Sequence, residues 1–374
     1  MIINKKLSVL YKGQLVGTLA QADYRTAFEY ADNWIDKGFS ISPFSLPLEK
    51  KVFLPTKLHF QGLFGVFADS LPDAWGNVLL NRVLNKNGIK ADEITPLTRL
   101  AIVGSSGMGA LTYEPEAPLE QGITGTDLDE LAMECQKILY AEYSDKLDEL
   151  YRLGGTSGGA RPKIMTNVDG EEWIIKFPAH VDGENIGKME YDYSQCAKKC
   201  GIIMTDTKLF SSRQCDGYFG TKRFDRVITS SGMERKHMIT AAALLELDFN
   251  QPCMDYHSLM KMTKILTRDN KQDVENMFRR MCFNVFAHNR DDHAKNFTFL
   301  YEEGKGWRLS PAYDLTYSTT YYGEHTTTID GEGAAPTEKH LIQVGLQAGL
   351  GKVRCQQMME EVYACVNEQL SEYL

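Results

Sequence analysis

The stretch VFAHNRDDHAKNFTFLYEEGKGWRLSPAYDL, residues 285–315, decides how the rest of the chain is interpreted. It contains two adjacent acids, Asp291 and Asp292, then Asn296, and a further acid, Asp314, after a hairpin-like interval. Core packing does not require such a set of polar residues. An acid, an asparagine five residues later and a second acid are residue types that metal-assisted phosphoryl transfer uses.

In that interpretation Asp291 takes the proton of an acceptor hydroxyl, while Asn296 and Asp314 supply hard oxygen ligands to Mg²⁺ at the nucleotide phosphates. For any one of these residues taken singly, a polar loop that simply follows a helix is the alternative. A transition-metal site in a hydrolase is a further alternative, with ligands drawn from His288, Asp291, Asp292 and His293. No second histidine cluster accompanies them, so phosphoryl transfer is favoured.

Composition restricts the class of protein. The chain has 374 residues, of which 43% are apolar and 24% charged, which is typical of a soluble globular protein of roughly two domains. A net charge of −9 disfavours direct non-specific binding to nucleic acid. The sequence has no apolar run of about 18 residues, and its start lacks the apolar core of a signal peptide. We therefore expect a cytoplasmic protein without membrane contact.

The eight cysteines are scattered along the chain without a C-x-x-C pair. In a chain of this length they are predicted to be reduced and mostly buried thiols. This spacing does not predict a zinc site.

Residues 1–120 are predicted to form an α+β subdomain without a titratable cluster. Lys12-Gly13 marks a β-hairpin over residues 7–19. Pro72 is predicted at the first position of a helix within 63–84, behind Ser70 or Leu71. The other elements expected are a helix over 24–36, an irregular loop over 41–48, and a helix, glycine turn and strand over 97–113.

A segment rich in Pro, Glu and Gly, residues 115–125, is predicted to be a linker, and a helical pattern follows over 126–151. Residues 153–165, LGGTSGGARPKIM, then carry four glycines around Thr156 and Ser157. Such loops cradle phosphates because glycine lets successive N–H groups face one anion, although a flexible turn is the alternative. Lys176, at the end of the strand EEWIIK, is well placed to bind α- and β-phosphates. Glu190 is a candidate to pair with it, and a solvated carboxylate in the first turn of a helix is the alternative for this residue.

The remainder of the chain, apart from two strands within 207–226, is predicted to be mainly helical. Apolar periodicity indicates helices over 237–249, 256–266, 273–289, 337–348 and 352–370. Asp273 is expected to cap the helix that leads into the acid pair. FTFL and WRLS are expected to form a hairpin after Asn296, and residues 316–335 a loop.

Taken together, these motifs resemble the HipA family of serine/threonine kinase toxins over nearly the whole chain. LFGVFADSLPDAWG and GSSGMGAL resemble its N-terminal subdomain, GGTSGGARPK its phosphate loop, IIKFP its lysine strand, and KRFDR the segment that joins the lobes. DDHAKNF and LSPAYDL resemble its catalytic and metal motifs. The resemblance implies an α+β, two-lobed protein-kinase-like fold: subdomain 1–120, an N-terminal lobe over 126–226, and a mainly helical C-terminal lobe over 227–374.

The resemblance also implies residue roles. Asp291 would be the catalytic base, and Lys295 a second catalytic residue that shapes the loop together with His293. Mg²⁺ would be held by Asn296 and Asp314. ATP would be bound by Thr156, Ser157, Gly158, Gly159, Lys163, Lys176, Phe224, His293, Asn296 and Asp314.

Three positions depart from the family pattern. The loop hydroxyl that is autophosphorylated in the family corresponds to Thr156, where the family usually has Ser, and Ser157 lies beside it. Phosphate there would repel the phosphates of ATP. Lys222 stands where Glu is common, so adenine recognition is expected through the backbone near Phe224. Asp292 stands where relatives have Gly, and an acid that supports the loop is its expected role.

The implied function is an ATP- and Mg²⁺-dependent toxin kinase that phosphorylates a translation component such as an aminoacyl-tRNA synthetase. Its expected partner is a HipB-like helix-turn-helix antitoxin, through which alone it would reach DNA. Two alternatives remain open: a small-molecule phosphotransferase of kinase-like fold, and an antitoxin-bound transcriptional corepressor.

Overall fold

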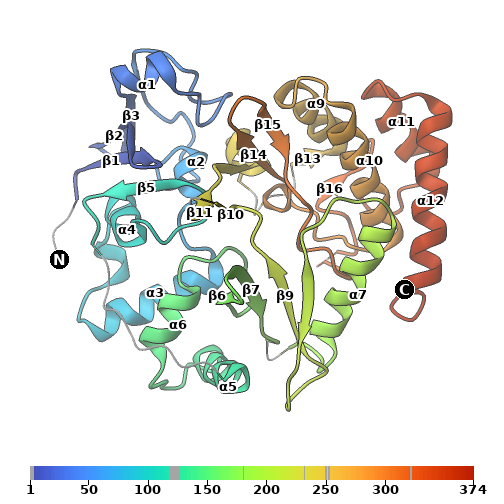
Figure 1. Cartoon of the computed structure of the whole chain (residues 1–374), viewed down its shortest axis with the longest axis horizontal. Coiled ribbons are helices and arrows are strands. Elements are labelled where there is room, and N and C mark those ends of the chain that lie inside the picture. Colours follow the sequence, from blue (N-terminus) through green and yellow to red (C-terminus); the bar gives the residue numbers. More distant parts are fainter. Residues whose placement is uncertain are drawn as a thin grey trace. The chain divides into compact units, whose positions relative to one another are not determined.

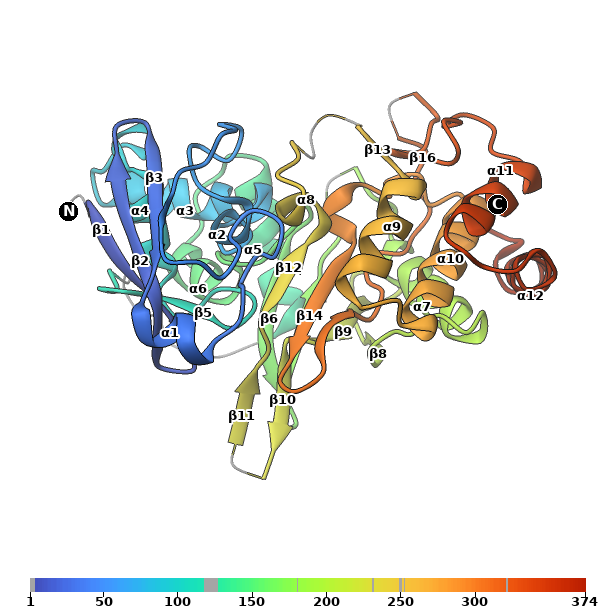
Figure 2. The ribbon, with the colours of Figure 1, turned by 90° about the horizontal axis from the view of Figure 1, so that it is seen from above.

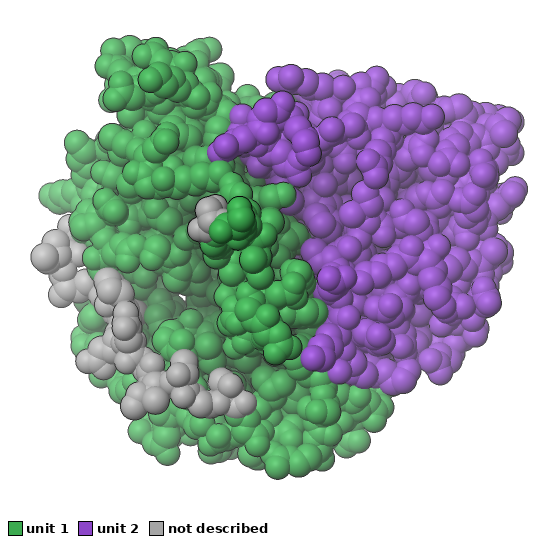
Figure 3. Space-filling view, in the orientation of Figure 1, with its two compact units in different colours: residues 1–187, 210–239, 243–246 green, residues 188–209, 240–242, 247–374 purple. Residues whose placement is uncertain are grey.

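The computed structural model describes residues 4–117, 127–179, 181–230, 232–248, 251, 253–320 and 322–374. The chain divides into two compact units (Figure 3). Unit 1 comprises residues 1–187, 210–239 and 243–246, and unit 2 comprises residues 188–209, 240–242 and 247–374. Most of the linker predicted at 115–125 lies outside the described residues.

Unit 1 begins with a five-stranded antiparallel sheet in the order β4-β3-β2-β1-β5 (Figure 1). Its strands are β1 (Lys6–Tyr11), β2 (Gln14–Ala22), β3 (Arg25–Tyr30), β4 (Val52–Phe53) and β5 (Leu111–Glu114). The hairpin predicted around Lys12-Gly13 is confirmed, and both turn residues have positive φ. The helix predicted over 24–36 is wrong in its first half, because Thr26, Phe28 and Tyr30 alternate inward in β3 and only α1 (Asp32–Lys37) is helical.

Between β4 and β5 the chain forms the helices α2 (Gly65–Ala68), α3 (Ala74–Lys86) and α4 (Pro96–Val103), and the 3₁₀ turn η1 (Ala91–Glu93). The prediction that Pro72 occupies the first helical position is wrong, because α3 has Asp73 as its N-cap. The Asp73 side chain makes no capping hydrogen bond. Its carboxylate instead accepts the backbone N–H of Gly159 at 3.0 Å, which ties the start of α3 to the glycine-rich segment.

The rest of unit 1 is built on three antiparallel neighbours, β6 (Lys163–Val168), β7 (Glu171–Lys176) and β9 (Tyr218–Lys222). The helical pattern over 126–151 corresponds to two helices, α5 (Leu128–Leu139) and α6 (Leu147–Gly154). Side chains from α3, α5, α6 and these strands share one apolar core, which includes Trp75, Leu131, Leu150, Ile164 and Tyr218. β8 (Thr207–Phe210) precedes β9 as predicted, and β10 (Arg226–Thr229) and β11 (Gly232–Arg235) form a hairpin (Figure 2).

Unit 2 is mainly helical. α10 (Lys271–Phe286) contacts both α9 (Tyr256–Leu266) and α12 (Lys352–Leu370), as Figure 2 shows. The other elements of unit 2 are α7 (Ile186–Lys199), β13 (Met254–Asp255), η2 (Ala294–Asn296), β14 (Thr298–Glu302), β15 (Gly306–Leu309), β16 (Thr327–Thr328) and α11 (Glu338–Gln347). The residues of β12 (Met238–Thr240) and α8 (Ala241–Leu244) are divided between the two units. β14 and β15 form the predicted hairpin, and the closing helices lie where apolar periodicity placed them.

Two predictions in this region are wrong. The apolar run at 237–249 is not one helix: strand β12 is followed by the four-residue helix α8. Ile239 and Ala241 are fully buried, and a run without a polar face has no periodicity to separate strand from helix. Asp273 is not the cap of α10, because Asn270 caps it by accepting the Asp273 N–H at 3.1 Å. The Asp273 carboxylate pairs with Arg308 at 3.3 Å.

Among the described residues, none of the helices combines the length and the apolar character that a membrane-spanning segment requires. The cysteines are free thiols, and five of the eight are buried, which agrees with the expectation from their spacing.

Candidate active site

The loop that follows α10 carries the acid pair in unit 2. It begins with His288, whose φ is +51°, and this left-handed residue turns the chain out of the helix. Asn289 N–H donates to the carbonyl of Asn284 at 2.9 Å, and the His288 carbonyl accepts from Ser318 N–H at 3.0 Å. The loop is therefore held by its parent helix on one side and by the 316–335 segment on the other.

Asp291 and Asn296 are joined within this loop. Asn296 Nδ2 donates to the backbone carbonyl of Asp291 at 2.7 Å. With the amide nitrogen used in this way, Asn296 Oδ1 points away from that carbonyl and can serve as a hard ligand. The Asp291 carboxylate is 58% exposed, and its Oδ1 lies 3.9 Å from His293 Nε2. The loop thus presents a solvent-accessible carboxylate beside a side-chain amide oxygen.

Asp292 has a different environment, because it is only 1% exposed. Its Oδ2 accepts from the Tyr256 hydroxyl at 2.9 Å and lies 3.1 Å from His325 Nδ1, while Oδ1 accepts from Thr327 N–H at 3.0 Å. Burial, with the Asp292 charge as a second cause, raises the pKa of Tyr256 well above its usual range. Asp292 therefore fixes the loop to α9 and to β16, which agrees with the expected supporting acid.

The alternative transition-metal site is not supported by these positions. The oxygens of Asp292 are engaged by three protein groups, whereas Asp291 faces solvent. Within the described ranges, the side chains of three or more His, Cys, Asp or Glu residues converge only at a group of cysteines, Cys196, Cys200 and Cys365.

Asp314 lies beyond the β14–β15 hairpin. Its φ is +53°, a left-handed conformation that Asp tolerates better than most residues. The hydroxyl of the preceding residue, Tyr313, lies 2.5 Å from the Lys295 carbonyl and 2.5 Å from Thr298 Oγ1. This phenol connects the segment that carries Asp314 to the segment that carries Asn296. The carboxylate and amide oxygens of these two residues are the donor types that Mg²⁺ prefers.

The glycine-rich segment lies against α3 in unit 1. Trp75 N–H donates to the Gly159 carbonyl at 3.2 Å, and Trp75 Nε1 donates to the Lys163 carbonyl at 3.1 Å. The approach is close enough that a Cβ at Gly76 would lie 2.5 Å from the Gly155 carbonyl oxygen. Glycine at position 76 is therefore required for this packing.

Both candidate hydroxyls of this segment point into the protein. Thr156 is 6% exposed, and its Oγ1 donates to the Ser106 carbonyl at 3.0 Å. Ser157 is fully buried, and its hydroxyl donates to the Gly154 carbonyl at 2.6 Å. Lys163 Nζ donates to the Gly158 carbonyl at 2.5 Å. In this conformation both hydroxyls and the Lys163 ammonium group donate hydrogen bonds to backbone carbonyls.

Lys176 ends β7 and pairs across the strands with Lys163 of β6. Its ammonium group lies 5.6 Å from the centroid of the Phe219 ring. Lys222 forms an ion pair with Glu171. Phe224 follows β9 and is half-buried. Glu190 is buried in α7, and its pairing with Lys176 stays a prediction.

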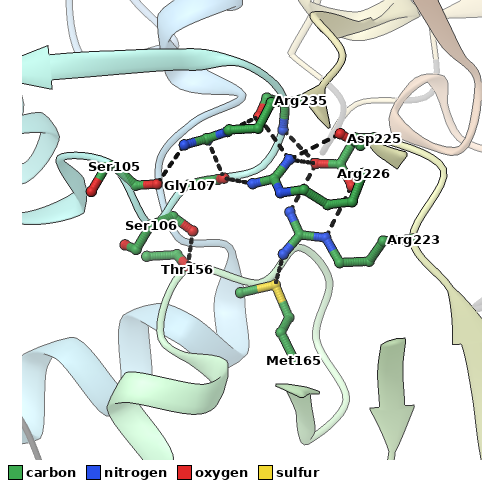
Figure 4. Close-up of polar contacts among 10 residues, drawn as sticks. Ser105, Ser106, Gly107, Thr156, Met165, Arg223, Asp225, Arg226 and Arg235 are labelled. Carbon is green, nitrogen blue, oxygen red and sulfur yellow. Dashed lines mark hydrogen bonds and ion pairs between the residues drawn. The ribbon is translucent and has the colours of Figure 1, made fainter. Parts of the chain in front are cut away.

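A buried charge cluster follows Phe224 in unit 1 (Figure 4). Asp225 is fully buried and accepts from Arg223 Nε at 2.9 Å and Nη2 at 2.8 Å, and from Arg226 Nη1 at 2.6 Å. Burial alone would raise the pKa of Asp225, but Arg223 and Arg226 lower it to about 2. Arg226 and Arg235 also donate to the carbonyls of Gly107 and Gly109.

The charge cluster holds the GSSGMG turn, residues 104–109, and that turn contacts the glycine-rich segment. Arg235 Nη1 donates to the Ser105 carbonyl at 2.6 Å, and the next carbonyl, that of Ser106, accepts from Thr156 (Figure 4). Sequence reasoning singled out KRFDR and GSSGMG separately and missed this connection. The signal available was the density of arginine around one acid in RFDR.

Two family models match this chain. The HipA-like C-terminal domain matches residues 155–370, and the HipA N-terminal domain matches residues 7–114. The chain belongs to the HipA family. The range 155–370 of this HipA family member contains the glycine-rich hydroxyls, Lys176 and the whole 285–315 stretch.

Solved and curated relatives agree with this assignment. One solved relative is HipA from the Shewanella oneidensis MR-1 toxin–antitoxin system, in a complex with HipB and operator DNA. It superposes on this chain with a TM-score of 0.73 at 16% sequence identity, and the match covers 98% of this chain and 90% of that chain. The α+β, kinase-like fold of HipA is thereby shown. Two proteins of Sinorhizobium fredii described as putative kinases are similar in sequence. Y4mE is 23% identical over 84% of this chain and 78% of its own length, and Y4dM is 25% identical over 45% of this chain and only 42% of its own length.

Proposed function

We propose that this HipA family member is an ATP- and Mg²⁺-dependent serine/threonine protein kinase and the toxin of a toxin–antitoxin module. The observation that carries the proposal is the construction of the loop in unit 2. Asn296 is tied to Asp291 through one hydrogen bond, and Tyr313 ties the Asp314 segment to Lys295 through another. One exposed carboxylate and two oxygen ligands are thus supplied by segments that are bonded to each other.

Each residue has a defined task in this proposal. Asp291 takes the proton of the acceptor hydroxyl as the new P–O bond forms and the bond to the β-phosphate breaks. Asn296 Oδ1 and Asp314 are the proposed ligands of Mg²⁺, which, when bound, neutralises charge that develops on the phosphates. Lys176 and Lys163 are proposed phosphate contacts, and the backbone near Phe224 is the proposed contact of adenine. Lys295 and His293 hold the shape of the loop.

Autophosphorylation of the glycine-rich segment is part of the proposal. Thr156 and Ser157 donate their hydroxyl protons to the buried carbonyls of Ser106 and Gly154. A phosphate carries about −2 charge and no proton to donate at such a carbonyl, so neither residue can be modified and keep its present contacts. Phosphorylation would therefore require the modified hydroxyl to leave the Ser106 or Gly154 carbonyl, and the phosphate would hold the segment away from it.

The proposed partners follow from the family and from charge. The solved relative is a complex with HipB and operator DNA, and we propose a HipB-like helix-turn-helix antitoxin here. A chain of net charge −9 would meet DNA only through such a basic partner. The proposed substrate is a translation component such as an aminoacyl-tRNA synthetase.

The proposal is tested by incubating the full chain with ATP and Mg²⁺ and mapping phosphate by mass spectrometry. Phosphate is expected on Thr156 or Ser157 in the wild type and not in Asp314→Asn. Omission of Mg²⁺ should have the same effect as the substitution. A wild-type chain that transfers phosphate to other substrates while both hydroxyls stay unmodified would refute the autophosphorylation step alone. A chain that transfers no phosphate under any condition would refute the kinase.

A further inference from the structure

Three thiols converge in unit 2 at a place that the proposed kinase reaction does not use. Cys196 and Cys200 are four residues apart in α7, so they project from one face of the helix. Cys365 comes from α12. The three sulfur atoms all lie within 4.8 Å of one another, and Cys196 Sγ and Cys365 Sγ are 4.0 Å apart.

This spacing matches a metal-centred triangle. Metal–thiolate bonds of about 2.3 Å to one ion in the plane of three sulfurs would place those sulfurs about 4.0 Å apart. A disulfide, in contrast, requires two sulfurs at about 2.05 Å, and a third thiol has no role in it. The separation of Cys196 Sγ and Cys365 Sγ, 4.0 Å, equals the metal-centred value, and the other two separations lie within 4.8 Å.

The donor set selects the kind of ion. Among the described residues the group contains thiols and neither imidazole nor carboxylate. Structural Zn²⁺ sites almost always have four protein ligands, whereas soft thiolate ligands select Cu(I). Cys196 and Cys200 are 1% and 2% exposed, which protects bound Cu(I) from water, and the half-exposed Cys365 offers an entry path.

We propose that Cys196, Cys200 and Cys365 form a three-thiolate site for Cu(I) that links α7 to α12. On binding, each ligating thiol exchanges its S–H bond for an S–Cu bond and releases its proton to solvent, and no electron is transferred. Burial raises the pKa of the Cys365 thiol, whereas the Lys199 ammonium lowers it. The free energy of the metal–sulfur bonds offsets the free energy needed to deprotonate the thiols.

The linked helices have a defined connection to the catalytic loop. Tyr193 of α7 donates its hydroxyl to the Ala287 carbonyl at 2.9 Å, at the residue that follows α10. Cys200 Sγ lies 4.0 Å from the Val362 carbonyl of α12. Bound Cu(I) would therefore fix α7, and with it the base of the loop, relative to the last helix of the same unit.

The test is an anaerobic titration of the full chain with Cu(I), buffered by a coloured Cu(I) chelator. Wild type is expected to remove one Cu(I) per chain from the chelator and to unfold at a higher temperature when loaded. Cys365→Ser should weaken Cu(I) binding by at least about tenfold and abolish the thermal shift. Cys253→Ser, which changes the exposed thiol, is the matched control and should behave as wild type.

X-ray absorption at the copper edge of loaded wild type supplies a test that needs no variant. Three sulfur neighbours at about 2.3 Å are expected. The proposal would be overturned if wild type failed to take Cu(I) from the chelator, or if Cys365→Ser bound Cu(I) equally well. It would also be overturned if the chain bound Zn²⁺ but not Cu(I), or if the copper had mainly nitrogen or oxygen neighbours.

Discussion

Asp225→Asn should be one of the most destabilising single substitutions in unit 1. Asn keeps the shape of the side chain but removes the charge that faces Arg223 and Arg226 at a site with no solvent exposure. The lowering of the Asp225 pKa from 3.8 to about 2 corresponds to about 2 kcal/mol. Removing one partner of a buried ion pair usually costs about 3–5 kcal/mol, because the remaining charges are left uncompensated, and we expect a loss of stability in that range.

Thermal unfolding followed by tryptophan fluorescence measures this loss, because three of the four tryptophans, Trp34, Trp75 and Trp173, belong to unit 1. For a unit of roughly 200 residues, about 3–5 kcal/mol lowers Tm by about 6–20 °C. Asp127→Asn is the matched control. The Asp127 carboxylate pairs with Arg213 at 2.7 Å, but the two side chains are 49% and 76% exposed.

Asp127→Asn keeps a good cap on α5 and removes only an exposed ion pair, so we expect a cost below about 1 kcal/mol. If Asp225→Asn lowered Tm no more than this control, the assignment of Asp225 as the centre of the cluster would be refuted.

Three further substitutions test other parts of the structure. Glu246 is half-buried and its carboxylate accepts Gly65 N–H at 2.9 Å, and the loss of solvent raises the pKa of this carboxyl to about 7. The unfolded chain loses this proton at lower pH than the folded chain. As the pH rises from about 4.5 to 7, the free energy of unfolding of wild type, measured in urea, should therefore fall by up to about 3 kcal/mol relative to that of Glu246→Gln. If the two unfolding free energies ran parallel over this pH range, the prediction would be contradicted. Gly76→Ala should release the glycine-rich segment from α3, cost about 1–3 kcal/mol and speed proteolysis near Gly159, whereas Gly351→Ala, at a site with open space, should not. Tyr313→Phe should cost about 1–2 kcal/mol and raise the Mg²⁺ concentration needed for phosphate transfer, and an unchanged Mg²⁺ dependence would argue against its positioning of Asp314.

The parts of the fold that could be predicted from sequence are those with a local signal. The closing helices, α9, α10 and the hairpins have clear apolar periodicity or turn residues, and the structure confirms them. The wrong predictions occur where local signals compete. β3 contains apolar residues that fit both periods, and residues 239–244 are all buried and so have no polar face. The first helical position expected at Pro72 lies after the N-cap Asp73, and Asn270 rather than Asp273 caps α10.

In the candidate site, too, only the features with a local sequence signal could be predicted. The D-x4-N spacing places Asp291 and Asn296 close together because only four residues of one loop separate them. The role of Tyr313, the contact of the Asp225 cluster with the turn at residues 104–109, and the thiol triangle depend on contacts between distant segments. Cys196 and Cys365 are 169 residues apart in the chain, and no single-sequence pattern pairs them.

The central claim is that Asp291 is the base of a phosphotransferase. It is tested most directly by the rate at which the full chain transfers the labelled γ-phosphate of ATP to protein in the presence of Mg²⁺. Asp291→Asn should lower this rate at least about 100-fold. Because the Asp291 carboxylate is 58% exposed, Tm should stay unchanged.

Asp206→Asn is the matched control, since the Asp206 side chain is 76% exposed and far from the loop in sequence. It should retain the wild-type rate. A wild-type rate in Asp291→Asn, measured beside this control, would contradict the assignment of the catalytic base.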